Sequence, residues 1–319
     1  MLEQSNDLAA TEIGGAVAEI ESEVVGPPKK GRLRGIPFGA WLAIAWLTIV
    51  VLGAIFIPMF VHSPSDPGVL AGQGIFKVSG HPLGGDLVGN DMLLQLAKGA
   101  RSSLIVAIGA VLFGLVVGGA AGLMAGYYRR RTDTVLTGSF NVLLAIPQLI
   151  LAVALVAALA NDSFDKNGIP VPASSGRRLL ILIVALGIVS IPILGRITRA
   201  NTLQWSQREF VVAARAQGAN NRRIMIREVL PNVLPAMFSI ALLGVAVVMV
   251  AEGGLSILGV GVQAPAVSWG SLIAGARDNL QDQPHVIFEP IVCLFLTVLS
   301  LNYLGDTVRA RFDVRESAL

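Results

Sequence analysis

Six long apolar stretches separated by polar segments dominate the chain. They lie near residues 38–61, 103–128, 134–160, 179–196, 236–258 and 286–304. Each has about 18 residues or more, enough to cross a hydrocarbon layer about 30 Å thick at a rise of about 1.5 Å per residue. Because backbone amides in lipid can pair only with one another, this pattern predicts an all-α protein with six transmembrane helices.

Composition supports a membrane protein. Of the 319 residues, 54% are hydrophobic and 14% are charged, and the mean hydropathy is +0.69; soluble domains average about 25% charged residues. The pI of 9.3 could indicate a nucleic-acid partner. The basic residues, however, are spread over separated loops with little aromatic interleaving, so membrane topology explains them better and we expect no nucleic acid to bind.

The distribution of positive charge predicts the orientation. With the N-terminus in the cytoplasm, seventeen of the 24 Lys and Arg residues fall on inner segments. The outer segments hold the other seven, which are Lys77, Lys98, Arg101, Lys166, Arg177, Arg178 and Arg277. The positive-inside rule therefore predicts a multi-pass protein of the inner or plasma membrane with both termini in the cytoplasm.

This topology divides the chain into four parts. We expect a cytoplasmic tail with a basic anchor at 1–35, then the first helix and an outer segment at 36–102. In that outer segment the amphipathic stretch 92–98 predicts a short helix lying on the outer face. A core of five transmembrane helices at 103–310 contains the cytoplasmic loop 197–235. A second cytoplasmic tail follows at 311–319.

The polar, arginine-rich segment 209–235 is the most informative part of the sequence. Residues 211, 212, 215 and 219 lie at helical spacing, and small alanines at 213, 214 and 216 would let a short helix seat closely in a groove. Gly218 suits the end of that helix, where a left-handed residue is often required. Pro231 and Pro235 suit the first turn of the next membrane helix. The alternative is a solvated basic face that only satisfies the positive-inside rule.

Polar and conformationally special residues within the spans are further candidates. Glu252 follows a long apolar run near the outer boundary; it is either a polar group at an outer gate or a carboxylate that bonds the turn 253–261. Pro147 and Pro192 invite kinks, which either line a transport path or are ordinary features of membrane helices. Trp269, with Pro265 and the Gly-rich turn before them, is either part of an outer lip that meets another protein or an interfacial anchor.

Glycines recur every four residues in the second span, at Gly114, Gly118, Gly122 and Gly126. This spacing stacks a groove on one helix face and predicts a close helix–helix contact, with a chance run in a Gly-rich chain as the alternative.

Several kinds of chemistry have no support in the sequence. The three histidines lack metal-like spacing, and a single cysteine, Cys293, excludes an internal disulfide framework. The chain has no G-x-x-x-x-G-K-[ST] loop for ATP and no arrangement typical of an intramembrane protease. We therefore expect a non-catalytic chain with no metal or cofactor of its own.

The sequence resembles the C-type permease subunit of dipeptide and oligopeptide ABC importers. The matching blocks, in family order, are HPLGGD (81–86), GARSSL (99–104), LAIP (144–147), the segment from 197 to 235, AEGGLSILGVGV (251–262), and Pro265 with SWG (268–270). The resemblance implies a type I ABC importer fold that forms half of a pore. The implied partners are a homologous second permease, two ATPase subunits that bind ATP and Mg, and an extracytoplasmic peptide-binding protein that delivers the peptide.

By the same resemblance, the cytoplasmic loop carries a coupling helix that docks on the ATPase. The residues assigned to this role are Arg208, Glu209, Phe210, Ala213, Ala214, Arg215, Gly218 and Ala219. Glu252, Pro147 and Asn141 are candidates for the gate or substrate path. The alternatives are a permease for nickel or another small solute, and a secondary transporter, which would need intramembrane carboxylates near the midplane.

This chain departs from the family pattern at several positions. Val212 stands where the pattern has Glu before the two alanines, and Glu228 replaces an Ile before Leu-Pro. In the third span, relatives often carry an Arg and an Asp where this chain has Gly138 and Asn141, so we expect no ion pair between those positions.

Overall fold

The computed structural model describes residues 37–62, 64, 66–160, 163–164, 170–171 and 174–316, with side chains up to residue 311 except at 67, 163–164 and 170–171. The proposed N-terminal tail and the end of the C-terminal tail lie outside these residues. The long helices of the described part are α2 (Phe38–Phe60), α3 (Met92–Tyr128), α4 (Arg130–Ala145), α5 (Gln148–Leu159), α6 (Ser175–Trp205), α9 (Leu230–Ile257) and α11 (Pro284–Glu316). Residues 311–316, assigned to a tail from the sequence, continue α11.

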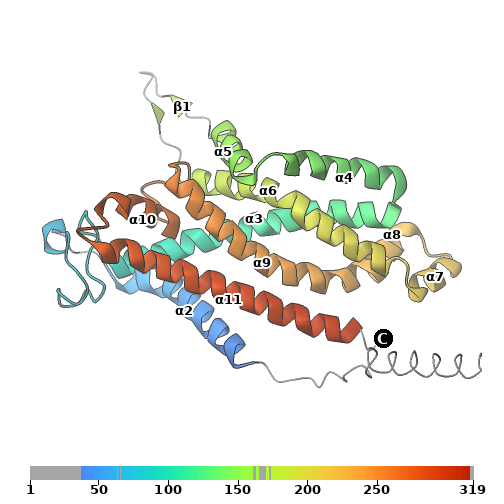
Figure 1. The fold of residues 1–319 in the computed structure, drawn as a ribbon, viewed down its shortest axis with the longest axis horizontal. Coiled ribbons are helices and arrows are strands. Elements are labelled where there is room, and N and C mark those ends of the chain that lie inside the picture. The colour runs from blue at the N-terminus through green and yellow to red at the C-terminus, as the bar shows by residue number, and fades with distance from the viewer. Residues whose placement is uncertain are drawn as a thin grey trace, which may run out of the picture. The chain divides into compact units, whose positions relative to one another are not determined.

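Helices α3 and α6 form the centre of the bundle. They make the most extensive contact of any two elements, and α9 packs against both (Figure 1). Helix α11 lies against α9, and α2 lies against α3 and α11. Within the described residues, five helices are long and apolar enough to cross a membrane. Their outward faces expose large apolar side chains such as Phe56, Val116 and Val247, which suits contact with lipid or another apolar surface.

The third predicted span is broken. Helices α4 and α5 together have the length and composition of a span, but they meet at an angle of 92°. Helix α4 ends at Ala145, Ile146 is extended, and Pro147 precedes the first turn of α5. Proline disfavours helical geometry in the residue before it, so the break falls at this position. The sequence correctly predicted an apolar helical segment here but not the break.

Helix α3 is longer than its predicted span. The sequence predicted a separate short helix at 92–98 on the outer face, and this prediction was wrong because α3 runs without interruption from Met92 to Tyr128. Asp91 caps its first turn by accepting a hydrogen bond from the Leu94 amide at 2.9 Å. The Asp91 side chain also pairs with His81, which ties the preceding segment to the start of the helix.

Small elements close both ends of the bundle. At one end α10 (Trp269–Ala276) follows a turn that includes a cis peptide before Pro265. At the other end lie α7 (Glu209–Ala216) and α8 (Asn221–Arg223). Figure 1 shows α10 and α7 at opposite ends of the long helices. Two two-residue strands, β1 (Ser163–Phe164) and β2 (Pro170–Val171), pair antiparallel between α5 and α6.

Candidate functional site

Helix α7 lies between the two long helices α6 and α9, where the sequence predicted a short docking helix. One face is anchored: Val211 is 1% exposed and packs in the same core as Ile224, with Ala214 half-buried beside it. The opposite face is open to solvent and carries Glu209, Val212, Ala213 and Ala216. Val212 is 60% exposed. The segment therefore presents a narrow apolar stripe, formed by Val212, Ala213 and Ala216, on a helix fixed from behind.

A glycine ends α7. Gly218 has φ of +81°, in the left-handed region that disfavours residues with a Cβ. Its amide donates to the Arg215 carbonyl at 3.0 Å, and the Ala219 amide donates to the Ala214 carbonyl at 3.1 Å. This pair of hydrogen bonds is the Schellman motif, which satisfies the last carbonyls of a helix. The structure therefore gives Gly218 a conformational role and leaves it exposed.

Two residues assigned to docking contact α6 instead of pointing freely outward. The Phe210 ring lies 6.2 Å from the Trp205 ring, centroid to centroid, and the Arg208 guanidinium carbon lies 5.4 Å from the centre of the same Trp205 ring. A cation over an indole face is attractive. These contacts hold the start of α7 against the end of α6, while Arg215 on the last turn stays exposed.

Beyond α7 the chain returns to helix earlier than the prolines indicated. Asn220 caps α8 by accepting a hydrogen bond from the Arg223 amide at 2.8 Å, and a π-helical segment, Ile224–Val229, leads directly into α9. The sequence predicted that Pro231 and Pro235 begin the membrane helix. Pro231 does lie in the first turn of α9, but the helical path already starts at Asn221. Pro231 has no backbone N–H to donate to the preceding turn, and the wider π turn before it accommodates the proline ring.

The end of α3 and the residue that follows it support this end of the bundle. Tyr127 donates to the Asn221 side chain at 3.0 Å, and Arg129 reaches Ser206 at 3.4 Å. These contacts connect the elements on both sides of α7 to the central helix α3.

Two polar residues of α4, Asp133 and Asn141, contact arginines of α6. The guanidinium of Arg199 pairs with both carboxylate oxygens of Asp133, the second at 2.6 Å from a terminal nitrogen. The Arg196 guanidinium donates to Asn141 at 2.5 Å. No ion pair was expected between positions 138 and 141, and the Asp133–Arg199 pair, whose members are 66 residues apart, was not predicted from the sequence.

Glu252 is a hydrogen-bonded core carboxylate. It is 1% exposed and accepts from the hydroxyls of Ser268 at 2.7 Å, Ser256 at 2.8 Å and Ser103 at 3.4 Å. This cluster joins α3, α9 and the start of α10. Of the two alternatives for Glu252, these hydrogen bonds match a carboxylate that bonds the turn after α9. A role of Glu252 in an outer gate stays a prediction.

Trp269 is buried, and both predictions for it were wrong. It is 1% exposed, so it is neither an outer lip nor an interfacial anchor. Its indole N–H donates to the Leu96 carbonyl at 3.0 Å and its backbone amide donates to Ser103 at 3.2 Å. Gly99 lacks the side chain that would collide with the indole ring. Trp269 therefore fastens α10 to α3.

The four spaced glycines of α3 lie against α6. A Cβ added at Gly114 would stand 2.8 Å from the Ser190 Cβ, and one at Gly126 would stand 2.7 Å from the Thr202 Cβ. At Gly118 and Gly122 the nearest atoms are backbone atoms of Ile191 and Gly195 in α6. The glycines thus sit where the two backbones approach most closely. Pro192 is buried within the same stretch of α6.

The fold and these contacts define a multi-pass helical membrane protein with an exposed short helix at one end. A family model described as "Binding-protein-dependent transport system inner membrane component" matches residues 118–317. The chain belongs to this family of membrane permeases.

Individual relatives agree with this assignment. The dipeptide transport system permease protein DppC of Alkalihalophilus pseudofirmus is 34% identical over 85% of this chain and 85% of its own. The glutathione transport system permease protein GsiD of Pectobacterium atrosepticum is 34% identical over 74% of this chain and 73% of its own. The di/tripeptide transport system permease protein DppC of Pseudomonas aeruginosa is 32% identical over 89% and 88%.

A solved structure supports the fold. A chain of the MetNI methionine ABC transporter in an inward-facing conformation superposes with a TM-score of 0.55 at 21% identity, covering 69% of this chain and 97% of that one. At this identity the likeness concerns the fold alone, and the fold is that of an ABC importer permease.

Proposed function

We propose that the chain is the permease subunit of an ATP-driven peptide importer and that α7 is the helix through which an ATPase subunit drives it. The observation that carries this proposal is the anchored α7 with its exposed apolar stripe. A helix held rigidly at both ends and from behind transmits a push to α6 and α9, whereas a flexible loop would absorb it. The membership in a binding-protein-dependent family supports the same role.

The proposed partners follow from this role. A second, homologous permease completes the pore, two ATPase subunits bind ATP and Mg and supply the energy, and an extracytoplasmic binding protein delivers the substrate. Relatives with about a third of their residues identical are named for dipeptide, di/tripeptide and glutathione transport, and all three substrates contain peptide bonds. We therefore assign short peptides as the substrate class.

The orientation is part of the proposal. The α7 end carries the arginine-rich segments and faces the cytoplasm, where ATP is available, and the α10 end faces outward. A Gln217→Cys variant in a Cys293→Ala background tests this, because Gln217 is exposed and caps α7 through its backbone amide, whereas Asn220 caps α8 through its side chain. A membrane-impermeant maleimide should label it in inside-out vesicles only. Labelling of intact cells would reverse the orientation.

The coupling role is tested in the purified complex in nanodiscs, with ATP hydrolysis measured as binding protein and peptide are added. Ala213→Trp adds bulk to the exposed stripe without moving a buried group, and Gly218→Trp adds bulk at the helix end and also strains its left-handed backbone. Both should abolish stimulation by peptide-loaded binding protein. Gly176→Trp is the matched control, because Gly176 is also exposed with free space around it but lies at the start of α6, away from α7. Normal stimulation in Ala213→Trp would refute docking through α7.

A further inference from the structure

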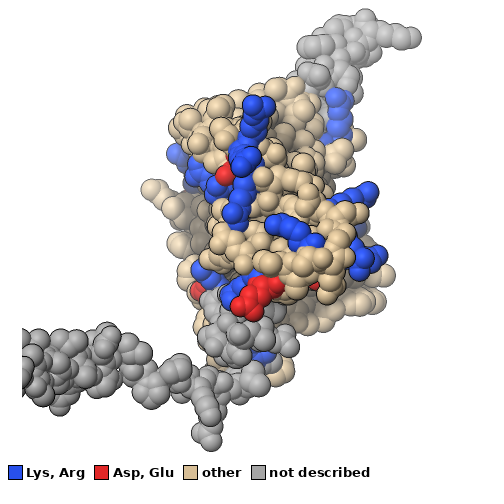
Figure 2. All heavy atoms as spheres, turned by 90° about the vertical axis from the view of Figure 1, so that its right-hand side faces the viewer, with Lys and Arg blue, Asp and Glu red and all other residues tan. Residues whose placement is uncertain are grey.

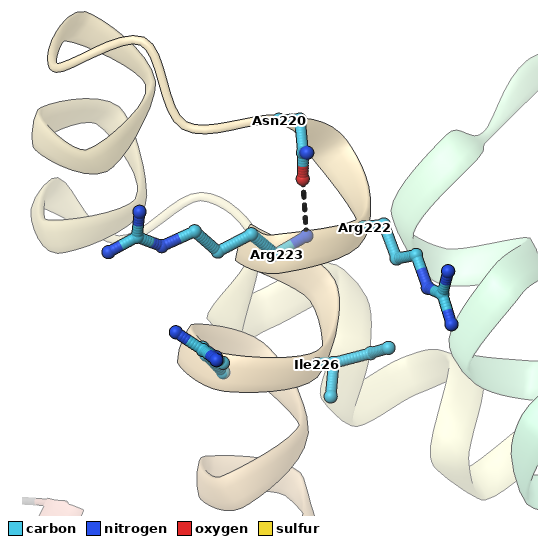
Figure 3. A pocket seen from close by; sticks show the side chains of 5 residues that line it. Asn220, Arg222, Arg223 and Ile226 are labelled. Atoms are coloured by element: carbon cyan, nitrogen blue, oxygen red, sulfur yellow. Dashed lines mark hydrogen bonds between the residues drawn. The ribbon is translucent and has the colours of Figure 1, made fainter.

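Three arginines lie within six residues just after α7. Arg222, Arg223 and Arg227 are all exposed, and together with Asn220 and Ile226 they line a shallow pocket of about 300 Å³ (Figure 3). Figure 2 views this end of the bundle and shows Lys and Arg side chains at several places on its surface, with fewer Asp and Glu side chains. The pocket is therefore a hollow lined mostly by basic side chains, on a face with more basic than acidic residues.

The three arginines do not point the same way. Figure 3 shows the Arg223 side chain extending to one side of the helix, while Arg222 and Ile226 extend to the other. Arg227 comes four residues after Arg223, a spacing that places both on one helix face. We call Arg223 and Arg227 the arginine pair. The π-helical segment that carries Arg227 packs directly against α7, so the pair lies beside the helix assigned to ATPase docking.

The arginine pair is not neutralised within the described part of the chain. Neither member forms an ion pair there, and Glu228, next to Arg227 in sequence, pairs with neither. Only the backbone amide of Arg223 is engaged, by the Asn220 cap. Like charges four residues apart on a helix repel each other and weaken it slightly. An acidic group from outside the chain would relieve this repulsion and fill the pocket.

The distance of the arginine pair from the hydrocarbon core argues against lipid headgroups as the acidic partner. The uninterrupted apolar run of α9 begins near Pro235, twelve residues after Arg223. At about 1.5 Å per residue the helix rises roughly 18 Å over this distance, somewhat less through the π turn. The headgroup layer on each side of the hydrocarbon core is only about 5–8 Å thick. Arg223 therefore lies beyond the headgroups, in the aqueous space that a soluble subunit occupies.

We propose that the arginine pair binds a carboxylate-bearing segment of the ATPase subunit, next to the groove that receives the α7 stripe. A guanidinium donates two parallel hydrogen bonds to a carboxylate, and two guanidiniums on one face offer a matched site for one or two acidic side chains. In this proposal the apolar stripe packs into the groove of the ATPase, and the arginine pair forms oriented, charged hydrogen bonds beside it. This inference rests on the proposed function, because it names the partner surface of the same docking site.

The test measures binding of the purified ATPase subunit to the rest of the complex in nanodiscs, over a range of salt concentrations. The double variant Arg223→Ala/Arg227→Ala and the single variant Arg223→Ala are compared with Arg222→Ala, which removes one positive charge from the opposite side of the helix. Each is measured in neutral phosphatidylcholine and in discs that also contain phosphatidylglycerol. A Lys double variant, Arg223→Lys/Arg227→Lys, retains the charge without the bidentate geometry.

The double variant should bind the ATPase about tenfold more weakly at low salt in both lipids, with a flatter salt dependence than the wild type. Arg222→Ala should bind like the wild type, and the Lys variant should recover part of the loss. An unchanged affinity in the double variant overturns the inference, as does a loss that appears only with phosphatidylglycerol or that Arg222→Ala reproduces. If the wild-type chain itself binds no ATPase, the proposed function fails instead.

Discussion

Replacement of Gly122 by Ala tests the packing of α3 on α6 most sharply. A Cβ at this position would stand 3.0 Å from both the Arg199 backbone nitrogen and the Gly195 carbonyl carbon, with the Gly195 carbonyl oxygen closer still. Non-bonded heavy atoms pack best at about 3.5–4.0 Å. Because the obstructing atoms belong to the α6 backbone, no rotamer change removes the conflict, and the two helices must separate by roughly 0.5–1 Å.

The expected destabilisation follows from this geometry. Overpacking of a well-packed contact costs about 1–3 kcal/mol, and a rigid backbone neighbour points to the upper end. The higher helix propensity of Ala than of Gly offsets about 0.5–1 kcal/mol of this destabilisation. We therefore expect Gly122→Ala to lower the free energy of unfolding by about 2 kcal/mol.

Gly138→Ala is the matched control. It makes the same substitution within a helix, in α4, where no atom lies within 4 Å of the added Cβ. Only the helix preference acts there, so this variant should be as stable as the wild type or slightly more so. Both are measured by titrating the detergent-solubilised protein with sodium dodecyl sulfate and following tryptophan fluorescence. Equal stability of the two variants would refute the close approach of α3 and α6.

Three further predictions concern other contacts. Glu252→Ala leaves three serine hydroxyls without their acceptor in the core and should lower the free energy of unfolding by about 3 kcal/mol; Glu252→Gln keeps one acceptor oxygen and should lose about half of that in the same titration. A double-mutant cycle of Asp133→Asn and Arg199→Gln should give a coupling of only about 1 kcal/mol, because both side chains are partly exposed, and additive effects would show that the pair contributes nothing. Gly218→Asn should retain peptide-stimulated ATP hydrolysis, since Asn tolerates a left-handed backbone, whereas Gly218→Val should lose most of it; equal activities would remove the conformational role.

The sequence predicted the helices well because lipid imposes a strong local rule. A long apolar run must be helical, and its length alone indicates a span. Local patterns also predicted a short helix between α6 and α9, and a left-handed glycine, Gly218, at its end. The 92° break was not predictable from Pro147 alone, since proline in a membrane helix produces anything from a slight kink to a full break, depending on what neighbouring helices support.

The residues whose contacts were not predicted are those that pack against distant parts of the chain. Trp269 follows a Gly-rich turn and looked interfacial, but its partners Leu96 and Ser103 precede it by 173 and 166 residues. Asp133 gave no local sign of its partner Arg199. Contacts of this kind depend on how α10 and α4 fold back on the central helices, which spacing along one segment does not reveal.

The central claim, that this chain couples ATP hydrolysis to peptide entry, is tested most directly by uptake into proteoliposomes. The purified complex is reconstituted with ATP and Mg on the α7 side and binding protein loaded with labelled dipeptide on the other. We predict uptake that requires ATP and the binding protein, continues against a peptide gradient, and is lost in Ala213→Trp while Gly176→Trp retains it. Uptake that proceeds without ATP, or that Ala213→Trp leaves intact, would contradict the account.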